Sequence, residues 1–592
     1  MRFTQADHPA RPVLSAPLKR RPWRGLLLIW LAALLLDLWG IQQGPLRDWD
    51  ESLVARIALE LSEKSWPDLL LPTLWGEPYV NKPPGVHWLI AGLIHLWRAG
   101  AEADALPPEW LLRLAPALGS SLLSPLLGLV QWQLRPGRRA DALWTAAIAL
   151  TLLPLARHAH LVMLDGLQLT AIASLWLGLL LARPGRRWAL AGGLLAGLAT
   201  SALLLLKAPV APAVLLGSLA LRCTDGDLPR RAWRWLLFGL ALGLLPGLAW
   251  HGWHLACRGE DALVMWGRQG LARVVSGIEN HNGGPIPPLI QVLSGGWPWL
   301  LLWPAAIGAA WRQRRGRWGR WVLGLTTLTS LLVLPLQTQL PWYSLLLWPP
   351  FALGCGPPMA ALVSGAGLER LRCGIGRIWL VIALLLLTAI LISPLIPGLA
   401  PVAGIALPGC LGLLAAGLVL GFGKPGRQQR RRAAWGLVIG WSLTLLALFS
   451  TPLWNWELGE QPSIRPLLTL VSRPSRNGDL AAVPLLVEGL RGRPPSLQWY
   501  AQDPLKPRIQ ALSKAEKLLL VSQATSPEQT RLAQKLGPDW INRHRCALER
   551  TGEAGWHRWL CHLGPSLTDA RSPLDREGST RASHAAGDSD PG

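Results

Sequence analysis

The sequence has 592 residues, of which 51% are hydrophobic and only 16% are charged, and its formal net charge is +23 at pH 7. This composition excludes a soluble chain with a single core and indicates a protein that spans a membrane many times. The excess of positive charge could indicate nucleic-acid binding. However, the arginines form short clusters between apolar runs, where membrane proteins carry them in cytoplasmic loops, so we exclude nucleic acid as a partner.

The first apolar run, residues 25–40, follows the basic stretch Lys19–Arg24. No small-residue cleavage site follows it, so we interpret the run as an uncleaved first span rather than a signal peptide. The positive charge before it predicts that residues 1–24 are cytoplasmic, which places the segment after this span on the exoplasmic side.

A polar segment, residues 42–98, separates the first span from the rest and carries the best candidates for chemistry. Asp48, Asp50 and Glu51 place three carboxylates within four positions, and Lys82 stands between an asparagine and two prolines. A carboxylate can accept a proton from a hydroxyl group, and a lysine can hold a phosphate. The alternatives are that Asp50 and Glu51 are solvated loop charges and that Lys82 anchors a lipid headgroup.

Thirteen apolar runs reach the length of about 17 residues that a span requires. The shorter run Val86–Trp97 could be a short span or a helix on the membrane surface. If it lies on the surface, all later arginine clusters become cytoplasmic, so we choose this option. We therefore predict an all-α polytopic protein of the cell (inner) membrane, with an exoplasmic C-terminus and spans that begin near residues 25, 110, 141, 166, 188, 208, 235, 290, 321, 343, 378, 404 and 434.

Further ionisable residues lie at span ends on the predicted exoplasmic side. A charged side chain within a span costs about 2.5 to 3.5 kcal/mol at the bilayer centre, so such groups are often functional. One acidic loop and several basic groups on one membrane face suit a lipid that carries a phosphate. His158 and His160 also have a simpler explanation as incidental loop residues, and the set as a whole is Arg113, His158, His160, Asp165, Lys207, Arg268, Arg273 and His281.

Polar residues return after about residue 454, and the pattern predicts a small exoplasmic α/β domain over residues 454–567, followed by a disordered tail, 568–592. A helix is predicted from Ser526, with a proline and a capping-box glutamine in its first turn, to Gly537.

Cys546 and Cys561 are equidistant from a turn signal at residues 552–555. Two strands meeting at this turn would place the cysteines opposite each other, within the disulfide range of about 4.4 to 6.8 Å between Cα atoms. Two free thiols are the alternative. No zinc-ligand spacing is visible among the seven cysteines.

The polar segment resembles the first loop of the bacterial aminoarabinose transferases and the related protein O-mannosyltransferase-like enzymes. The resemblance implies an integral membrane glycosyltransferase of the GT-C type that uses a polyprenyl-phosphate sugar as donor. It covers most of residues 25–350 and rests on Asp50-Glu51, Ala55, Ile57-Ala58, Glu60, Gly76-Glu77-Pro78-Tyr79, Lys82-Pro83-Pro84, Trp88, Arg113-Leu114, Asp165-Gly166, Leu206-Lys207, Arg273, His281, Pro285, Trp297-Pro298-Trp299, Leu340-Pro341 and Tyr343.

Carried over to these positions, the resemblance implies that Asp50 is the base or acceptor-orienting carboxylate and that Glu51 is its partner. Lys82 and Arg273 would contact the donor phosphate, and direct attack by the acceptor hydroxyl would invert the anomeric configuration. A divalent metal ion near the carboxylates is compatible with the sequence, although no closed ligand set is visible. The remaining predicted substrate-binding residues are Arg113, Asp165, Lys207 and His281.

Some positions differ from the family pattern, because Leu53, Val54, Ala208 and Gln339 replace arginine, tyrosine, glycine and lysine. The missing cations leave the sugar, its carrier and the acceptor open, and the acceptor could be a lipid, a glycan or a protein. Two other functions remain as alternatives. A flippase of lipid-linked sugars would carry charges at mid-span and two related halves, which we do not find, and a non-catalytic scaffold would not depend on its first loop.

Overall fold

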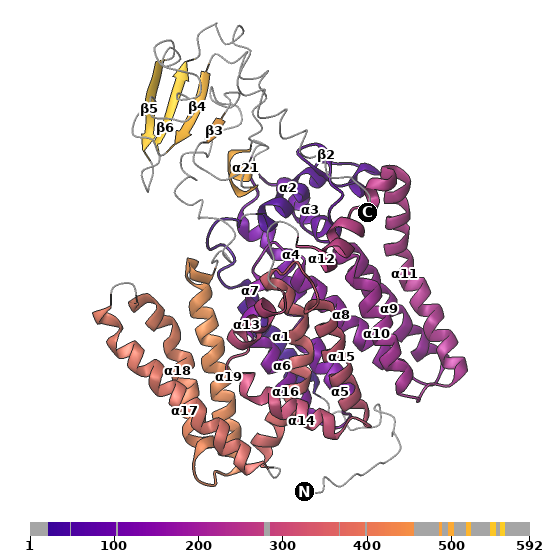
Figure 1. The fold of residues 1–592 in the computed structure, drawn as a ribbon, viewed down its shortest axis with the longest axis vertical. Coiled ribbons are helices and arrows are strands. Elements are labelled where there is room, and N and C mark those ends of the chain that lie inside the picture. Colours follow the sequence, from indigo (N-terminus) through magenta and orange to yellow (C-terminus); the bar gives the residue numbers. More distant parts are fainter. Residues whose placement is uncertain are drawn as a thin grey trace. The chain divides into compact units, whose positions relative to one another are not determined.

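A computed structural model of the chain describes residues 22–47, 49–101, 105–277, 284–365, 368–396, 399–454, 485–487, 495–502, 517–522, 545–551 and 557–562. The chain forms two compact units (Figure 1). Unit 1 consists of residues 1–44, 57–100 and 107–458, and unit 2 consists of residues 45–56, 101–106 and 459–592. The short segment 45–56, which contains the predicted catalytic pair, therefore groups with the C-terminal part of the chain.

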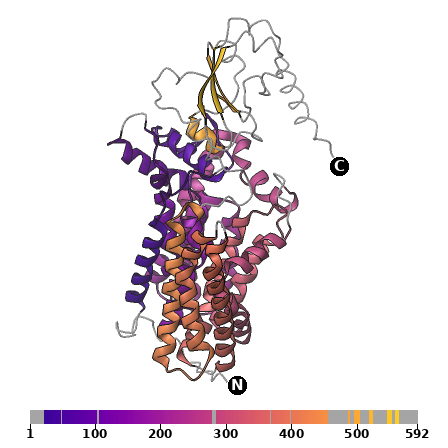
Figure 2. The ribbon, with the colours of Figure 1, turned by 90° about the vertical axis from the view of Figure 1, so that its left-hand side faces the viewer.

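The first half of unit 1 is a series of apolar helices, seen side-on in Figure 2. Each predicted span start in this half lies in a helix or within two residues of one. The helices are α1 Trp23–Leu38, α4 Glu109–Ser121, α5 Leu123–Leu134, α6 Arg139–Leu150, α7 Leu153–Ala159, α8 Asp165–Leu181, α9 Arg186–Lys207, α10 Val210–Thr224 and α11 Arg230–Arg258.

The second half of unit 1 is also helical and contains several short 3₁₀ turns and one π turn. Each predicted span start again lies within a helical element. The elements are η4 Gly259–Leu263, η5 Gly267–Leu271, α12 Ala272–Val275, α13 Ile286–Gly295, η6 Trp299–Leu302, α14 Trp303–Arg312, α15 Arg317–Val333, η7 Pro341–Leu347, α16 Trp348–Ser364, α17 Glu369–Ile392, η8 Ser393–Leu395, α18 Ala400–Gly421, α19 Arg427–Phe449 and η9 Pro452–Trp454.

Seven helices in the described part of the chain are long and apolar enough to cross a membrane. They become eight if α6 and α7, which meet at a bend of 62°, form one broken span. Three shorter apolar helices, α8, α10 and α13, add to this apolar body. The chain is therefore a polytopic helical membrane protein, and the number of thirteen spans stays a prediction.

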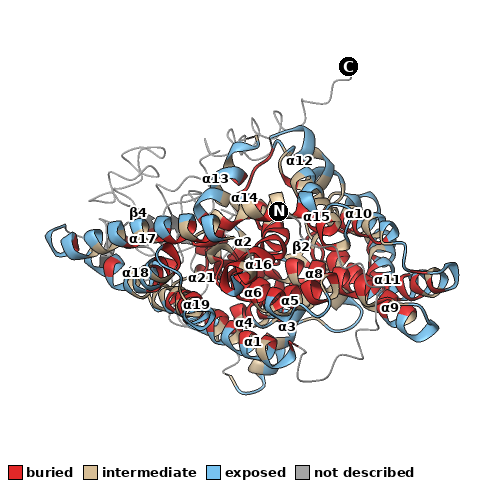
Figure 3. Cartoon of the chain, turned by 90° about the horizontal axis from the view of Figure 1, so that it is seen from below, coloured by how far each residue is buried: buried red, intermediate tan, exposed pale blue. Residues whose placement is uncertain are grey.

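Burial separates central helices from peripheral ones, as the end-on view of Figure 3 shows. Nearly all residues of α16 are buried, whereas α17 exposes many apolar side chains, such as Val381 and Leu385. An exposed apolar helix face is unfavourable in water but matches the hydrocarbon of a bilayer. Helices α9 and α11 approach closely, since a Cβ atom on Gly193 or Gly197 would lie only 2.1 or 2.3 Å from a carbonyl oxygen of α11.

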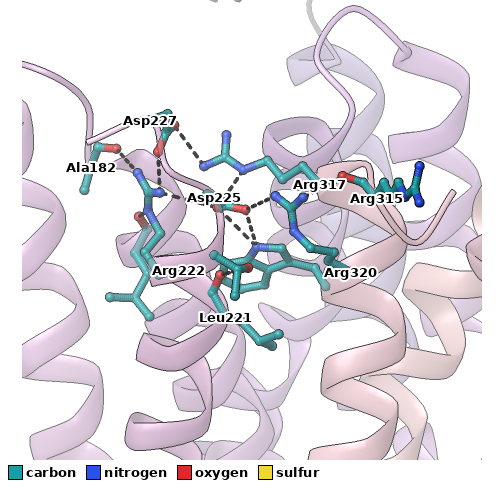
Figure 4. Close-up of polar contacts among 11 residues, drawn as sticks. Ala182, Leu221, Arg222, Asp225, Asp227, Arg315, Arg317 and Arg320 are labelled. Carbon is teal, nitrogen blue, oxygen red and sulfur yellow. Dashed lines mark hydrogen bonds and ion pairs between the residues drawn. The ribbon is translucent and has the colours of Figure 1, made fainter. Parts of the chain in front are cut away.

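One end of α8, α10 and α15 is joined by a network of charges (Figure 4), which we call the Asp225 cluster. The Arg222 guanidinium donates to the carbonyl oxygens of Leu179 and Ala182, at 2.9 and 3.1 Å. The Asp225 carboxylate, with a side chain only 2% exposed, is paired with three arginines at 2.8 to 3.4 Å. The members of the cluster are Arg222, Asp225, Asp227, Arg317, Arg320 and Trp321.

The predicted loop, residues 42–98, is folded rather than irregular. It contains a helix that continues from unit 2 into unit 1, a two-residue hairpin turn and a second helix. Trp75 and Gly76 both have positive φ, 55° and 80°, as a type I′ turn requires. The elements are α2 Asp50–Ser62, η3 Asp68–Leu70, β1 Thr73–Leu74, β2 Glu77–Pro78 and α3 Gly85–Arg98.

Helix α3 corresponds to the run whose crossing the sequence left open. Its 14 residues extend about 21 Å, which is shorter than the roughly 30 Å of a bilayer core. It begins against the C-terminal end of α9, because a Cβ atom on Gly85 would lie 2.6 Å from the Leu205 carbonyl oxygen. These features agree with a surface helix, and the orientation of the chain in the membrane stays a prediction.

Unit 2 contains a four-stranded sheet with the strand order β3, β4, β6, β5 and the helix α21 Pro495–Ala501. Strands β3 and β4 are parallel, and the other pairs are antiparallel. Cys546 pairs in register with Cys561, which confirms the predicted meeting of two strands, while the disulfide stays a prediction. The strands are β3 Leu485–Val487, β4 Lys517–Ser522, β5 Arg545–Thr551 and β6 His557–His562.

The predicted helix from Ser526, the tail 568–592 and residues 1–21 lie outside the described residues.

Candidate active site

Two predicted site residues meet where α8 begins and α9 ends. Lys207 is the last residue of α9, and its Nζ lies 3.4 Å from Oδ1 of Asp165, the first residue of α8. The Asp165 side chain is 7% exposed and that of Lys207 is 28% exposed. The ammonium group is therefore accessible, and its contact with the carboxylate is at the long end of hydrogen-bond distances.

Tyr343 connects this pair to a third predicted residue. The Lys207 Nζ lies 4.8 Å from the centre of the Tyr343 ring, and the Arg273 Nη1 donates to the Tyr343 hydroxyl at 3.1 Å. The Arg273 Nη2 donates to Gln269 Oε1 at 2.7 Å. We call Asp165, Lys207, Gln269, Arg273 and Tyr343 the Lys207 cluster. It joins α8, α9, η5, α12 and η7, which lie far apart in the sequence.

Arg113 is buried and holds a turn of the backbone. Its Nη1 donates to the carbonyl oxygens of Ile41, Gln43 and Gly44 at 2.8, 3.2 and 3.1 Å. Its guanidinium carbon also lies 5.2 Å from the centre of the Trp454 ring. These contacts hold the segment that connects α1 to the first loop. Arg113 therefore stabilises the structure here, and its contact with substrate stays a prediction.

The hairpin that precedes Lys82 is held by Glu60 of α2. The Glu60 carboxylate accepts hydrogen bonds from the backbone N–H groups of Trp75 and Gly76 at 2.6 and 3.2 Å, and from the Thr73 hydroxyl at 2.7 Å. Lys64 donates to Thr73 Oγ1 and to a backbone carbonyl at 2.9 Å each. Burial lowers the pKa of Lys64, and the nearby Glu60 carboxylate opposes this shift.

Lys82 lies half-buried in the turn between β2 and α3, close to a buried histidine. Burial lowers the pKa of His87 to about 3, and the positive charge of Lys82 lowers it as well. His87 is therefore neutral at physiological pH, and its ring packs edge-on against Tyr79 at 6.0 Å between centroids. Lys82 thus has a neutral neighbour in His87.

The predicted catalytic pair, Asp50 and Glu51, belongs to unit 2, and the two carboxylates differ. Glu51 is fully buried, and its Oε2 accepts a hydrogen bond from the backbone N–H of Arg47 at 2.9 Å. It therefore holds the start of α2. Asp50 is the first residue of α2 and is half-buried, where the helix dipole stabilises a carboxylate.

The segment that carries this pair packs on α21 within unit 2. The Tyr500 hydroxyl accepts from the backbone N–H of Leu46 at 2.8 Å, and Arg56 Nη1 donates to Gln502 Oε1 at 3.3 Å.

The remaining predicted site residues lie outside the described part of the chain or make contacts that stabilise the structure. His281 and Asp48 lie outside the described residues. In the part of the chain that the structure describes, no three His, Cys, Asp or Glu side chains gather as a metal site would require. His160 lies between the carbonyl oxygens of Ala156 and Trp39, at 2.7 and 2.9 Å, which is a structural setting.

The sequence did not predict the contacts that three residues near the candidate site make, namely Tyr343, Glu60 and His87. Tyr343 was quoted only as part of the resemblance, although its ring and hydroxyl connect Lys207 with Arg273. Glu60 was quoted in the same way, and His87 was not considered. No local sequence pattern indicates these contacts, because they join residues that are not neighbours in the sequence. Gln339, which replaces a lysine of the family pattern, donates to two carbonyl oxygens at 2.9 Å.

No protein-family model matches the sequence, and no curated protein matches it. Among solved structures, the chain is similar to ArnT from Cupriavidus metallidurans bound to undecaprenyl phosphate, with a TM-score of 0.66 and 17% identity over 92% of this chain and 99% of that chain.

The apo state of the same protein gives a TM-score of 0.64 with the same identity and coverage. An oligosaccharyltransferase from Archaeoglobus fulgidus is more distant, with a TM-score of 0.44 and 11% identity over 84% of this chain and 65% of that chain. The chain therefore has the fold of ArnT, a polytopic helical membrane fold of the GT-C type, as the first-loop residues predicted.

Proposed function

We propose that the protein is a membrane glycosyltransferase that transfers a sugar from a polyprenyl-phosphate donor to a hydroxyl group of an acceptor. The reaction would take place at the exoplasmic face of the cell membrane and would invert the anomeric configuration. The observation that carries this proposal is the Lys207 cluster, which gathers two cations at one end of an apolar bundle. The fold of ArnT, whose solved structure contains undecaprenyl phosphate, supports the same substrate class.

The charges of the Lys207 cluster suit a lipid phosphate. Lys207 and Arg273 contribute +2 and Asp165 contributes −1, so the cluster carries a net charge of +1. The long contact between Lys207 and Asp165 leaves the ammonium group able to turn toward a phosphate. Charge-assisted hydrogen bonds from arginine and lysine to phosphate are among the strongest in proteins, and they gain strength as negative charge develops on the leaving oxygen.

Asp50 and Lys82 complete the proposed chemistry through the resemblance of the first loop. The acceptor oxygen attacks the anomeric carbon while its proton passes to the Asp50 carboxylate. The bond between the anomeric carbon and the phosphate oxygen breaks, and its electron pair stays on the polyprenyl phosphate, whose charge Lys82 helps to stabilise. Glu51 already holds the start of α2, so we assign it to positioning.

A divalent metal ion at the Asp50 carboxylate is a further part of the proposal. Loss of transfer after treatment with a chelator, and recovery on adding one divalent metal, would support it. Full transfer in the chelated protein would remove the metal from the proposal.

The experiment that tests the function is incubation of the purified protein with a panel of polyprenyl-phosphate sugars and of lipid, glycan and hydroxyl-bearing peptide acceptors. We expect released polyprenyl phosphate and a glycosylated acceptor with at least one pair. Movement of the lipid-linked sugar across vesicles without release of polyprenyl phosphate would instead identify a flippase. Neither release nor movement would favour a scaffold.

A further inference from the structure

A small cavity in unit 1 is separate from the Lys207 cluster but includes Gly166, the residue after Asp165. It is lined by residues of α1, α4, α5, α6, α7, α8 and η7. Most of its wall is apolar, but four polar side chains line it, namely Asp37, Ser120, Ser124 and His158. All four are at least nine-tenths buried. The proposed transfer reaction does not use any of them.

The Asp37 carboxyl group is the unusual member of this wall. Its side chain is only 6% exposed, and it has no hydrogen bond or ion pair to any described residue. An ionised carboxylate that is buried without a cation is very costly, whereas the neutral acid is much less so. Asp37 therefore needs a bound proton or a bound cation to remain in this place.

The cavity fits one water molecule. The cavity volume is about 20 Å³, and roughly 10 to 15 Å³ is sufficient for one water that finds two to four polar partners. The Ser120 hydroxyl is buried and has no hydrogen-bond partner among the described residues. A water molecule in the cavity would satisfy both Ser120 and Asp37.

His158 contributes a hydrogen-bond acceptor to the same wall. Its Nδ1 lies 2.8 Å from the Pro154 carbonyl oxygen, which can only accept, so Nδ1 carries the hydrogen. The neutral ring then has an acceptor lone pair on Nε2. No lysine or arginine lines the cavity, so nothing on its wall competes with a proton for Asp37.

We propose that this cavity is a proton-binding site, in which Asp37 holds a proton and one bound water molecule connects the carboxylic acid to the hydroxyls of Ser120 and Ser124. Asp37 and His158 are the titratable groups of the wall. The other elements present only hydroxyl or apolar groups, such as Leu345 of η7 and Gly166 of α8.

The site is connected to the Lys207 cluster through the first turn of α8. A Cβ atom on Gly166 would lie 2.0 Å from Ser120 Oγ, so Ser120 packs directly on the residue that follows Asp165. When Asp37 loses its proton, an uncompensated charge forms beside Ser120, and the start of α8 must adjust. The proton on Asp37 thereby stabilises the backbone that presents Asp165 to Lys207.

Infrared difference spectroscopy of the full chain in lipid nanodiscs tests the proposal. At neutral pH we expect a C=O stretching band of a protonated carboxylic acid in the wild-type protein and its loss in Asp37→Asn. Asp141→Asn is the matched control, because Asp141 is also buried but its carboxylate lies 3.1 Å from the Arg135 guanidinium. This variant should keep the band.

Ser120→Ala tests whether a water molecule connects Asp37 to Ser120 or whether Asp37 is protonated without this bridge. This test remains possible even if Asp37→Asn does not fold. We expect the band to persist at a shifted frequency, because the acid loses a water-mediated partner. An unshifted band in Ser120→Ala would contradict the water bridge. Absence of the band in the wild-type protein, or its persistence in Asp37→Asn, would overturn the proton-binding site.

Discussion

Helix α8 connects two polar clusters that both pair an aspartate with cations but differ in how fully these charges are buried and paired. Its 17 residues extend about 26 Å, from Asp165 in the Lys207 cluster to the carbonyl oxygens that Arg222 holds in the Asp225 cluster. Asp225 is 2% exposed and is paired with three arginines. Lys207 is 28% exposed and has one long contact to a carboxylate.

The difference indicates which cluster stabilises the bundle and which one has capacity to bind a substrate. A buried charge network is favourable when its charges are paired, and in the Asp225 cluster the carboxylates and guanidinium groups pair with one another across the ends of three helices. In the Lys207 cluster, the Lys207 ammonium group has polar contacts only with the Tyr343 ring and, at 3.4 Å, with the Asp165 carboxylate among the described residues, so it can donate further hydrogen bonds. Such groups often mark functional sites.

The largest expected effect is on stability, at the Asp225 cluster. Asp225→Asn removes the carboxylate that compensates buried Arg222, and loss of one partner of a buried pair costs about 3 to 5 kcal/mol. We expect a marked fall in the thermal unfolding temperature of the protein in nanodiscs. Glu63→Gln is the control, because this side chain is 46% exposed and pairs with the partly exposed Arg98, so its loss should cost at most about 1 kcal/mol. Equal destabilisation by the two variants would contradict the assignment.

The same contrast between a structural and a reactive carboxylate is expected for the neighbours Asp50 and Glu51. Asp50→Asn should lower the transfer rate by about 10²- to 10⁴-fold, as loss of a general base does, with little change in donor binding. Glu51→Gln should mainly lower stability, by about 1 kcal/mol, because its carboxylate caps Arg47 N–H. Rates and unfolding temperatures of both variants check this. A larger rate loss in Glu51→Gln would reverse the two roles.

A smaller effect concerns the pH dependence of stability at His87. Its pKa is about 3 in the folded protein and 6.5 when unfolded, so the unfolded state binds the extra proton between these values. The stability that neutral His87 provides is present above pH 6.5 and is lost as pH falls toward 3. Between pH 6.5 and 5 the loss is about 2 kcal/mol.

Thermal unfolding of wild type and His87→Gln at pH 7 and pH 5 measures this contribution. We expect the variant to lose less stability on acidification than the wild type, by about that amount. The same loss in both proteins would mean that His87 is accessible to protons in the folded state.

Much of the helical fold could be predicted from the sequence, because apolar runs of sufficient length can only be spans. The positions of these runs and the register of Cys546 with Cys561 follow from local patterns, whereas the surface position of α3 stays a prediction. Local patterns also suggested Lys207, Asp165 and Arg273, but not that Tyr343 would connect them across 70 residues.

What could not be predicted depends on contacts between distant segments. Asp225 pairs with Arg317, which lies 92 residues later, and nothing near either residue indicates this partner. Nothing near Arg113 in the sequence indicates that its guanidinium donates to carbonyl oxygens of the turn after α1. Glu51 was predicted as the partner of Asp50, and this role stays a prediction, but the hydrogen bond that its carboxylate accepts from the Arg47 N–H was not expected.

Binding of undecaprenyl phosphate to the purified protein tests the central claim most directly. Lys207→Met and Arg273→Met each remove one charge-assisted hydrogen bond, worth about 1.5 to 3 kcal/mol, so we predict affinities weaker by roughly 10- to 150-fold. Arg317→Met removes the same charge from the Asp225 cluster, and it should leave the affinity unchanged in protein that remains folded. Equal affinities in all three variants and the wild type would contradict the claim that the Lys207 cluster holds the donor phosphate.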